Sequence, residues 1–346
     1  MQAPGFLPWQ QEQARRWLGR RERFAHAWLI HGLPGIGKRA YALAAAASLL
    51  CEAPQLGLAC GQCSACRWVA AGNHPDLRRI RPEAVALEEG QAAEAEEAEG
   101  SASRKTPSRD IRVDQLRSLH DWFNTATHRG GWRVAVLYPA EALNMVSANA
   151  LLKVLEEPPE HTVFLLVSDT PDRLLPTLVS RCRRQPLAAP ASDQATAWLA
   201  GQGVASPGEW LAAAGGAPLR ALELSASGMP QACPDWLAGL LQAWARGVPT
   251  EVGNAADELE KQPPLQWIDI LQRVFVDLTL AAVGAPVRYF PGQAQAIRQA
   301  AGRADMAQLT ATARWLASQR AVAGHPLNAK LLTQAVLQRA AQACAG

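Results

Sequence analysis

The feature that most constrains the fold of this chain is the stretch HGLPGIGKRA, from His31 to Ala40. It carries Gly32, Gly37 and Lys38 at the spacing of a phosphate-binding P-loop, GxxxxGK[ST]. An apolar segment, Ala27 to Ile30, precedes the loop, and an alanine-rich segment follows it. The order of strand, glycine loop and helix predicts an α/β fold with a parallel sheet that is covered by helices on both faces.

The P-loop departs from the motif at one position, because Arg39 stands where serine or threonine is required. That hydroxyl ligates the magnesium ion of a bound triphosphate. Backbone N–H groups and the helix N-terminus hold most of the phosphate, so the glycines and the lysine can still bind it. The sequence therefore predicts a degenerate nucleotide-binding site, formed by Gly32, Gly35, Gly37, Lys38 and Arg39.

A second departure lies at the end of another predicted strand, WRVAVLY. This run ends in Tyr138 and Pro139, where an ATPase would carry acidic residues for the metal. A third buried strand, TVFLLVS, follows the helical pattern SANALLKVLEE. Since two separate metal contacts are lost, we expect no intrinsic ATP hydrolysis. An active ATPase with an unusual P-loop is the alternative.

Four of the seven cysteines are clustered, and they follow the pattern Cx8CxxCxxC. They are Cys51, Cys60, Cys63 and Cys66. Four thiolates at this spacing predict a tetrahedral zinc site, which leaves no open position for water and is therefore structural. His74 is a further possible ligand, although the four cysteines suffice. A zinc-dependent DNA-binding module is the alternative, but no basic helix with base-reading side chains follows the cluster.

Composition indicates a globular cytoplasmic protein with no membrane partner. Of the 346 residues, 49% are apolar, enough for a proper core, and the apolar runs are too short to span a bilayer. The N-terminal residues lack the pattern of a signal peptide. The net charge of +3 is dispersed along the chain, which argues against a protein that mainly coats nucleic acid.

The chain divides into three predicted domains. Residues 1–184 form the P-loop domain, with a zinc module at about 51–66 and an acidic insert at about 83–110. The insert carries six glutamates between Glu88 and Glu99 and few apolar residues, so we expect it to be disordered. A functional acidic segment is the alternative. Strand signals fade after Cys182, and residues 185–226 and 227–346 are predicted as a small and a larger helical domain.

The segment that starts at Asn149 resembles a known family. The run NALLKVLEEPP leads to the strand TVFLLVS and then to a Ser-Arg-Cys motif at Ser180, Arg181 and Cys182. This arrangement closely resembles the AAA+ subunits of bacterial sliding-clamp loaders. The cysteine cluster, the HPD motif at His74 and the helical C-terminal third are similar to the same family, and together these features cover most of the chain.

The resemblance implies an AAA+ P-loop domain, a small helical lid and a helical collar that oligomerises. The family member with a degenerate P-loop is a fixed arm of the loader, and its Ser-Arg-Cys arginine reaches the ATP site of a neighbouring motor subunit. Here that residue is Arg181, for which a surface salt bridge is the alternative role. Arg220 matches a sensor arginine of the lid, or is structural. Lys153 and Glu156 either pair on the helix surface or face the neighbour.

The resemblance also implies the partners. They are the tau/gamma motor subunits and the delta subunit in a hetero-pentamer, and, through that complex, the sliding clamp and primer-template DNA. The chain would belong to the DNA polymerase III holoenzyme, a nucleotidyltransferase complex of DNA replication. We expect no polymerase or ATPase activity of its own. The cofactors implied are structural Zn²⁺ in this chain and ATP in the neighbouring subunits.

Overall fold

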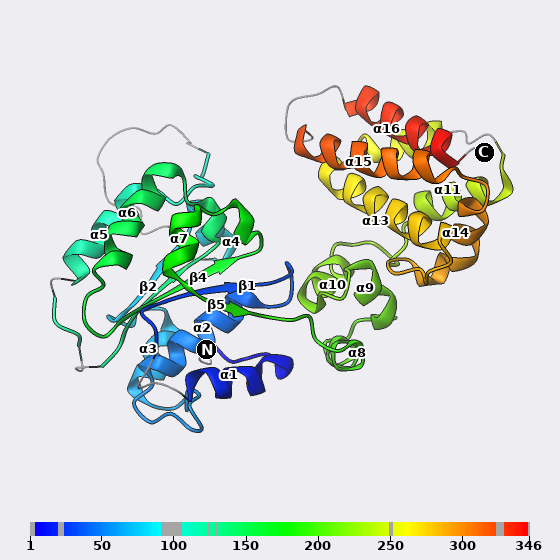
Figure 1. Cartoon of the computed structure of the whole chain (residues 1–346). Coiled ribbons are helices and arrows are strands. Elements are labelled where there is room, and N and C mark those ends of the chain that lie inside the picture. Colours follow the sequence, from blue (N-terminus) through cyan, green and yellow to red (C-terminus); the bar gives the residue numbers. More distant parts are fainter. Residues whose placement is uncertain are drawn as a thin grey trace. The chain divides into compact units, whose positions relative to one another are not determined.

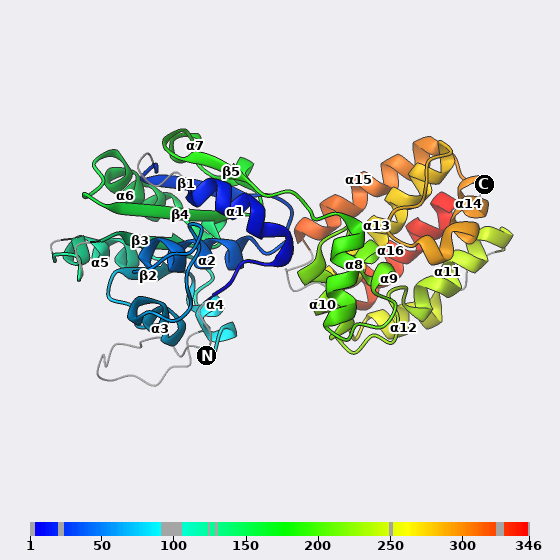
Figure 2. The same ribbon diagram turned by 90° about the horizontal axis from the view of Figure 1, so that it is seen from below.

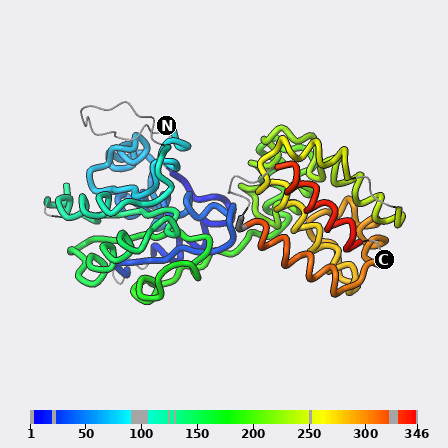
Figure 3. Tube along the Cα trace, turned by 90° about the horizontal axis from the view of Figure 1, so that it is seen from above, coloured from blue at the N-terminus to red at the C-terminus, as the bar shows by residue number. Residues whose placement is uncertain are grey.

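The computed structural model describes residues 4–19, 24–90, 106–123, 125–128, 131–248, 252–322 and 329–344. Contacts within the chain separate two compact units, Met1–Ala189 and Pro190–Gly346 (Figure 1). The Cα trace in Figure 3 passes from the first unit to the second once. None of the described helices combines the length and the apolar character needed to cross a membrane.

A five-stranded parallel sheet forms the centre of the first unit. Its strands lie in the order β2-β3-β4-β1-β5, so the P-loop strand β1 lies between β4 and β5. Every residue of β3 and β4 is buried, which accounts for their continuous apolar sequences. The strands are β1 Ala27–His31, β2 Leu77–Ile80, β3 Arg133–Leu137, β4 Thr162–Ser168 and β5 Arg183–Pro186.

Helices cover both faces of this sheet. One apolar cluster joins the strands to α5, α6 and α7, and α2 packs on the opposite face with α1 and α3 beside it (Figure 1). The helices are α1 Gln11–Leu18, α2 Lys38–Leu50, α3 Ser64–Ala71, α4 Glu83–Glu88, α5 Val113–Phe123, α6 Met145–Glu156 and α7 Pro176–Arg181. Together with the helical second unit, this confirms the predicted α/β fold class, a parallel sheet flanked by helices and followed by a helical region.

The predicted acidic insert begins differently from the expectation. Residues 83–88 form helix α4, and Glu83 pairs with Arg112 and accepts a hydrogen bond from the backbone N–H of Ser108 at 3.1 Å. The prediction of disorder from residue 83 was wrong. The segment has few apolar residues, but its acidic side chains form ion pairs and hydrogen bonds with residues that are distant in sequence. Residues 91–105, the remainder of the acidic run and its continuation, lie outside the described residues.

The second unit is helical throughout its described residues. Its helices are α8 Ser192–Gly201, α9 Pro207–Ala213, α10 Pro218–Ser225, α11 Asp235–Arg246, α12 Gly253–Leu259, α13 Pro264–Ala282, α14 Ala294–Ala301, α15 Met306–Val322 and α16 Ala329–Cys344. Figure 2 shows α13 crossing the unit next to α15, and its Trp267 and Phe275 are fully buried. The predicted lid and collar share one apolar core, which extends from Ala195 to Cys344. The boundary near residue 226 falls between α10 and α11 and stays a prediction.

Candidate functional site

The P-loop lies at the carboxyl edge of the sheet, between β1 and α2. Its last residue, Gly37, is the N-cap of α2 and has a left-handed backbone with φ 91°. Gly32 is required for a different reason, since a Cβ built on it would lie 2.3 Å from the carbonyl oxygen of Leu187. That residue follows β5, and its N–H donates to the carbonyl of His31 at 2.8 Å. The close approach of two strand ends therefore fixes the loop, independently of any phosphate.

The lysine of the P-loop is fully engaged by the chain itself. Its ammonium donates to the carbonyl oxygens of Gly32 at 2.9 Å and Leu33 at 2.5 Å. It also forms an ion pair of 2.5 Å with Asp169, the residue directly after β4. The Lys38 side chain is only 3% exposed. The cation that would meet a phosphate is thus already held by a carboxylate and two carbonyls.

The arginine that replaces the P-loop hydroxyl is engaged in the same way. Arg39 donates to one carboxylate oxygen of Glu89 at 3.1 Å. The other oxygen forms an ion pair with the Nε of Arg81 at 2.9 Å and accepts a hydrogen bond from the Tyr138 hydroxyl at 3.0 Å. Burial, with the nearby Glu89 carboxylate, raises the pKa of Tyr138 to about 12. The two positions that lost their metal ligands therefore converge on one carboxylate.

A third carboxylate lies close to the end of strand β4. Glu141 accepts from the Ser168 hydroxyl at 2.7 Å and from the backbone N–H of Thr170 at 2.5 Å. Burial raises the pKa of Glu141, but the hydrogen bonds from Thr170 and Ser168 outweigh it and leave that pKa lowered. Our sequence reasoning missed Glu89, Glu141 and Asp169 as site residues. Glu141 follows β3 closely and Asp169 follows β4 directly. Their positions after the ends of parallel strands were the signal that could have identified them.

The four predicted metal ligands meet at the other end of α2. The sulfur atoms of Cys51, Cys60, Cys63 and Cys66 all lie within 4.8 Å of one another. The Cys51 and Cys63 sulfurs are 3.9 Å apart. Tetrahedral zinc with Zn–S bonds of about 2.3 Å places its sulfurs roughly 3.8 Å apart, so the cluster fits a zinc ion. All four thiols are free of disulfides.

Local backbone groups prepare these thiols for a cation. The N–H groups of Gln62 and Cys63 point to the Cys60 sulfur at 3.5 and 3.4 Å, and they lower the pKa of Cys60 to about 6. The N–H of Cys60 lies 3.3 Å from the Cys51 sulfur, and that of Cys66 lies 3.4 Å from Cys63. Cys63 is also the N-cap of α3. The tight loop thus directs several N–H dipoles at the sulfurs, which favours a thiolate at Cys60. Burial raises the pKa of Cys51 and of Cys66.

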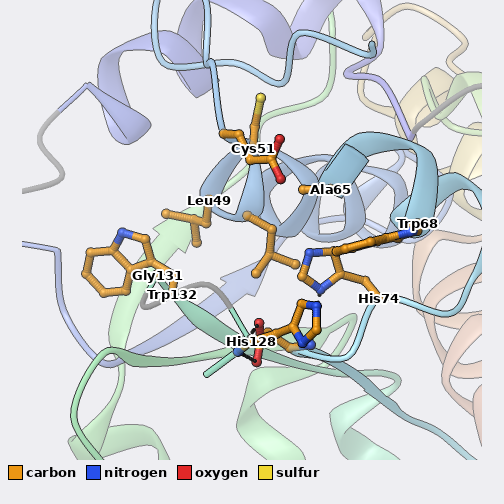
Figure 4. A pocket seen from close by; sticks show the side chains of 11 residues that line it. Leu49, Cys51, Ala65, Trp68, His74, His128, Gly131 and Trp132 are labelled. Atoms are coloured by element: carbon orange, nitrogen blue, oxygen red, sulfur yellow. Dashed lines mark hydrogen bonds between the residues drawn. The ribbon is translucent and has the colours of Figure 1, made fainter. Parts of the chain in front are cut away.

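His74 lies apart from the cluster that the four cysteines complete. It lines a neighbouring cavity of about 210 Å³, together with Trp68, Asp76 and His128. Its Nδ1 accepts a hydrogen bond from the backbone N–H of Asp76 at 3.1 Å. Figure 4 shows the rings of His74 and His128 close to each other beside Trp68, with the Cys51 sulfur pointing away from them. His74 therefore has a packing and capping role in this structure.

The Ser-Arg-Cys arginine ends helix α7. Arg181 donates to the carbonyl of Thr177 at 3.0 Å and to the Glu156 carboxylate, at the end of α6, at 2.5 Å. The Arg181 and Glu156 side chains are 35% and 51% exposed. Ser180 bonds the same Thr177 carbonyl at 3.0 Å, and Cys182 is buried against the sheet core. The surface salt bridge considered above is present, and exposed pairs of this kind contribute only about 0–1 kcal/mol.

The remaining predicted residues lie on helix surfaces. Arg220, on α10, is at 3.5 Å from Glu223 one turn further along the same helix. Lys153 is exposed on α6 and lines a groove of about 360 Å³ between α5 and α6. It is not the partner of Glu156, which pairs with Arg181 instead.

Comparison with known proteins gives consistent results. Residues 12–190 match the family model described as DNA polymerase III, delta subunit. The chain is 43% identical over 226 residues to DNA polymerase III subunit delta′ of Pseudomonas aeruginosa, covering 64% of this chain and 62% of that protein. It is 35% identical over 160 residues to subunit tau of Escherichia coli, covering 46% of this chain and 21% of that protein. The match thus spans less than two thirds of either relative.

Among solved structures, the chain is similar to a DNA polymerase III gamma subunit-related protein from Thermotoga maritima. The TM-score is 0.43 and the sequence identity 16%, with 97% of this chain and 99% of that chain covered.

Proposed function

The chain belongs to the DNA polymerase III, delta subunit, family, and from this premise we propose that it is a clamp-loader subunit of the DNA polymerase III holoenzyme. In this role it does not hydrolyse ATP. It completes the ATP site of a neighbouring motor subunit, and it holds one side of the assembly that loads the sliding clamp onto primed DNA during replication. The similarity to a delta′ subunit over 226 residues supports the assignment.

One observation carries the non-hydrolysing role: both cations of the P-loop are paired with carboxylates of the chain. Lys38 pairs with Asp169 at 2.5 Å and Arg39 with Glu89 at 3.1 Å. Hydrolysis needs a magnesium ion that bridges the phosphates, and this ion is held by a hydroxyl and an acid. Arg39 and Tyr138 occupy those positions, and neither offers a carboxylate or an aliphatic hydroxyl for the ion.

Arg181 supports the role in trans. A guanidinium offers several fixed N–H donors, keeps its charge at any relevant pH and neutralises the charge that develops on a transferring phosphoryl group. Arg181 ends α7 on the surface and is held by one exposed carboxylate and one carbonyl. Because an exposed pair is weak, a phosphate of a neighbouring subunit can replace Glu156 at little cost.

The cysteine cluster holds a structural zinc ion in this proposal. Cys51, Cys60, Cys63 and Cys66 supply all four ligands, so no coordination position is open for water or substrate. The ion contributes charge compensation and cross-linking, and it joins the end of α2 to the start of α3. The loop between these helices has little apolar core, since Leu56 at its tip is 80% exposed.

The partners follow from the same assignment. They are the homologous tau/gamma motor subunits and the delta subunit in a hetero-pentamer, with the sliding clamp and primer-template DNA bound through the complex. The similarity to a tau subunit over 160 residues supports a common ancestry with the motors. Helices α8 to α10 would serve as the lid, with Arg220 as a sensor or a structural residue, and α11 to α16 as the collar.

The test is ATP turnover by the reconstituted loader with clamp and primed DNA. We expect Arg181→Ala to lower hydrolysis at the facing site about a thousandfold, as for other arginine fingers. Arg173→Ala, an exposed arginine in the turn before α7, is the matched control and should leave turnover unchanged. Gel filtration checks that each variant still assembles. Unchanged turnover in an intact Arg181→Ala complex would contradict the proposal.

The isolated chain separates the two alternatives from this proposal. Turnover of ATP without partners would support an active ATPase with an unusual P-loop. Salt-dependent binding of DNA by the zinc-loaded chain alone would support a DNA-binding module. We expect neither.

A further inference from the structure

We propose that Glu89 and Asp169 are built-in substitutes for bound phosphate, and that these two carboxylates keep phosphate ligands out of a P-loop whose backbone cradle is intact. The proposal rests on the non-hydrolysing role above, because it explains how a loop with most of the motif stays empty. It assigns to two acidic residues outside the motif the function of determining what the loop can bind.

The backbone cradle is still suited to an anion. Among the described residues, the N–H groups of Gly35, Gly37, Lys38 and Arg39 form no backbone hydrogen bond outside the helix itself. Gly37 is the N-cap of α2 and has a left-handed backbone. Because α2 is 13 residues long, the helix dipole places a partial positive charge at its N-terminus. Unsatisfied N–H groups at such a terminus form an anion-binding site. The loss of binding therefore does not lie in the backbone.

The side chains of the cradle are the part that is already occupied. Asp169 takes the Lys38 ammonium, which is 3% exposed, while Asp169 itself is half exposed. Glu89 takes Arg39 with one oxygen and Arg81 with the other, and it is 15% exposed. Each carboxylate thus offers the kind of charge and oxygen acceptor that a phosphate would offer.

A carboxylate fixed by the fold has an advantage over a free anion. Asp169 directly follows the fully buried strand β4, and Glu89 is the C-cap of α4, so elements outside the loop carry both carboxylates. A free phosphate loses translational and rotational freedom when it binds, whereas these side chains lost theirs on folding. The internal carboxylates therefore compete successfully even though a phosphate carries more charge.

The experiment measures binding of inorganic tripolyphosphate to the full zinc-loaded chain by calorimetric titration. The double variant Glu89→Gln/Asp169→Asn keeps the size of both side chains and removes both charges. We expect it to bind one tripolyphosphate at least tenfold more tightly than the unmodified chain. Adding Lys38→Ala to the double variant should abolish that gain, because it removes the freed cation.

The matched control is Glu88→Gln/Asp172→Asn, which makes the same change in net charge at two exposed neighbours. An equal gain in the control would mean that general charge attracts the anion, and it would overturn the proposal. So would the absence of a gain in a double variant with an unchanged circular dichroism spectrum. Should the double variant not fold, Asp169→Asn alone is titrated, and its gain or lack of gain decides.

These outcomes are distinct from a failure of the proposed function. ATP turnover by the unmodified isolated chain would refute the non-hydrolysing role itself. An inert unmodified chain together with a double variant that binds no tripolyphosphate would refute only the role of Glu89 and Asp169.

Discussion

The two ends of helix α2 carry the two ligand motifs of this chain, and they differ in whether the chain has already supplied a partner. At the N-terminal end, Lys38 and Arg39 pair with carboxylates at 2.5 and 3.1 Å. At the C-terminal end, Cys51 and three further thiols surround a common centre within 4.8 Å of one another. Most of the P-loop motif survives, yet only the cysteine end is arranged for a ligand from outside.

The difference teaches that a motif specifies the local backbone, whereas the partners that its side chains bind depend on residues elsewhere in the chain. N–H groups of the cysteine loop itself point at its sulfurs, so short-range geometry prepares that site. The P-loop cations meet acids delivered by other elements, among them Glu89 at a sequence separation of 50. Four substitutions, in order of decreasing expected effect, test this contrast.

The largest effect is expected from breaking the cysteine cluster. Cys63→Ser removes a metal ligand but leaves a hydroxyl that can still accept the N-cap hydrogen bond of α3. We expect the zinc content to fall from one ion per chain, and the free energy of unfolding to fall by about 4 kcal/mol at free zinc a thousandfold above Kd. Elemental analysis and denaturant unfolding measure both. Cys233→Ser, outside the cluster, is the control; zinc retained by Cys63→Ser would contradict the assignment of ligands.

Gly32→Ala tests whether the P-loop is now a structural element. Its Cβ would meet the Leu187 carbonyl oxygen at 2.3 Å and Ile36 at 3.0 Å. We expect a loss of about 3 kcal/mol of stability by overpacking, with no phosphate involved. Gly131→Ala, whose Cβ would have no neighbour within 4 Å, is the control for denaturant unfolding. Equal stability of the two variants would mean that the ends of β1 and β5 can move apart at no cost, and it would contradict the structural role of Gly32.

Lys38→Ala sharpens the contrast at the occupied end. In a working P-loop this lysine serves the nucleotide, so its loss acts on binding. Here the substitution leaves two carbonyls and Asp169 without their buried donor. We expect the free energy of unfolding to fall by about 2 kcal/mol. The exposed Lys153→Ala is the control, and a stability loss no larger than in that variant would show that the lysine is not held as described.

The smallest effect concerns Glu141, the third internal carboxylate. Its pKa is lowered in the fold, so its contribution to stability is present above its ordinary value of 4.5 and is lost as pH falls through the lowered pKa. We expect Glu141→Gln to cost about 1 kcal/mol at pH 7 and progressively less below about pH 4. Unfolding at several pH values, with Glu160→Gln as control, measures the difference. A cost that is independent of pH would contradict the lowered pKa.

Much of the fold could be predicted from local sequence. The apolar runs that became β3 and β4 are buried at every residue, and strand, glycine loop and helix follow one another as predicted. The four cysteines could be grouped because their spacing alone brings three of them into one tight loop. In each case the interactions that matter lie within a few residues, or depend only on burial.

The remainder depended on pairs that are distant in sequence. Glu141 meets Ser168 across 27 residues, and Glu89 meets Tyr138 across 49. Glu89 belongs to a run of glutamates whose composition indicates disorder. Its cationic partners at the sheet edge, together with the distant partners of Glu83, explain the ordered helix before it. The parts of the site that the local backbone forms were therefore predictable from the sequence. The ion pairs and hydrogen bonds between side chains of separate elements were not.

The most direct test of this contrast is native mass spectrometry of the full chain with zinc and magnesium ATP present together. The account predicts the mass of the chain plus one zinc ion and no nucleotide at any ATP concentration up to millimolar. A saturable ATP adduct would contradict it, because the N-terminal end of α2 would then bind a ligand from outside. A folded chain without zinc would also contradict it, because the cysteine end would then need no ligand.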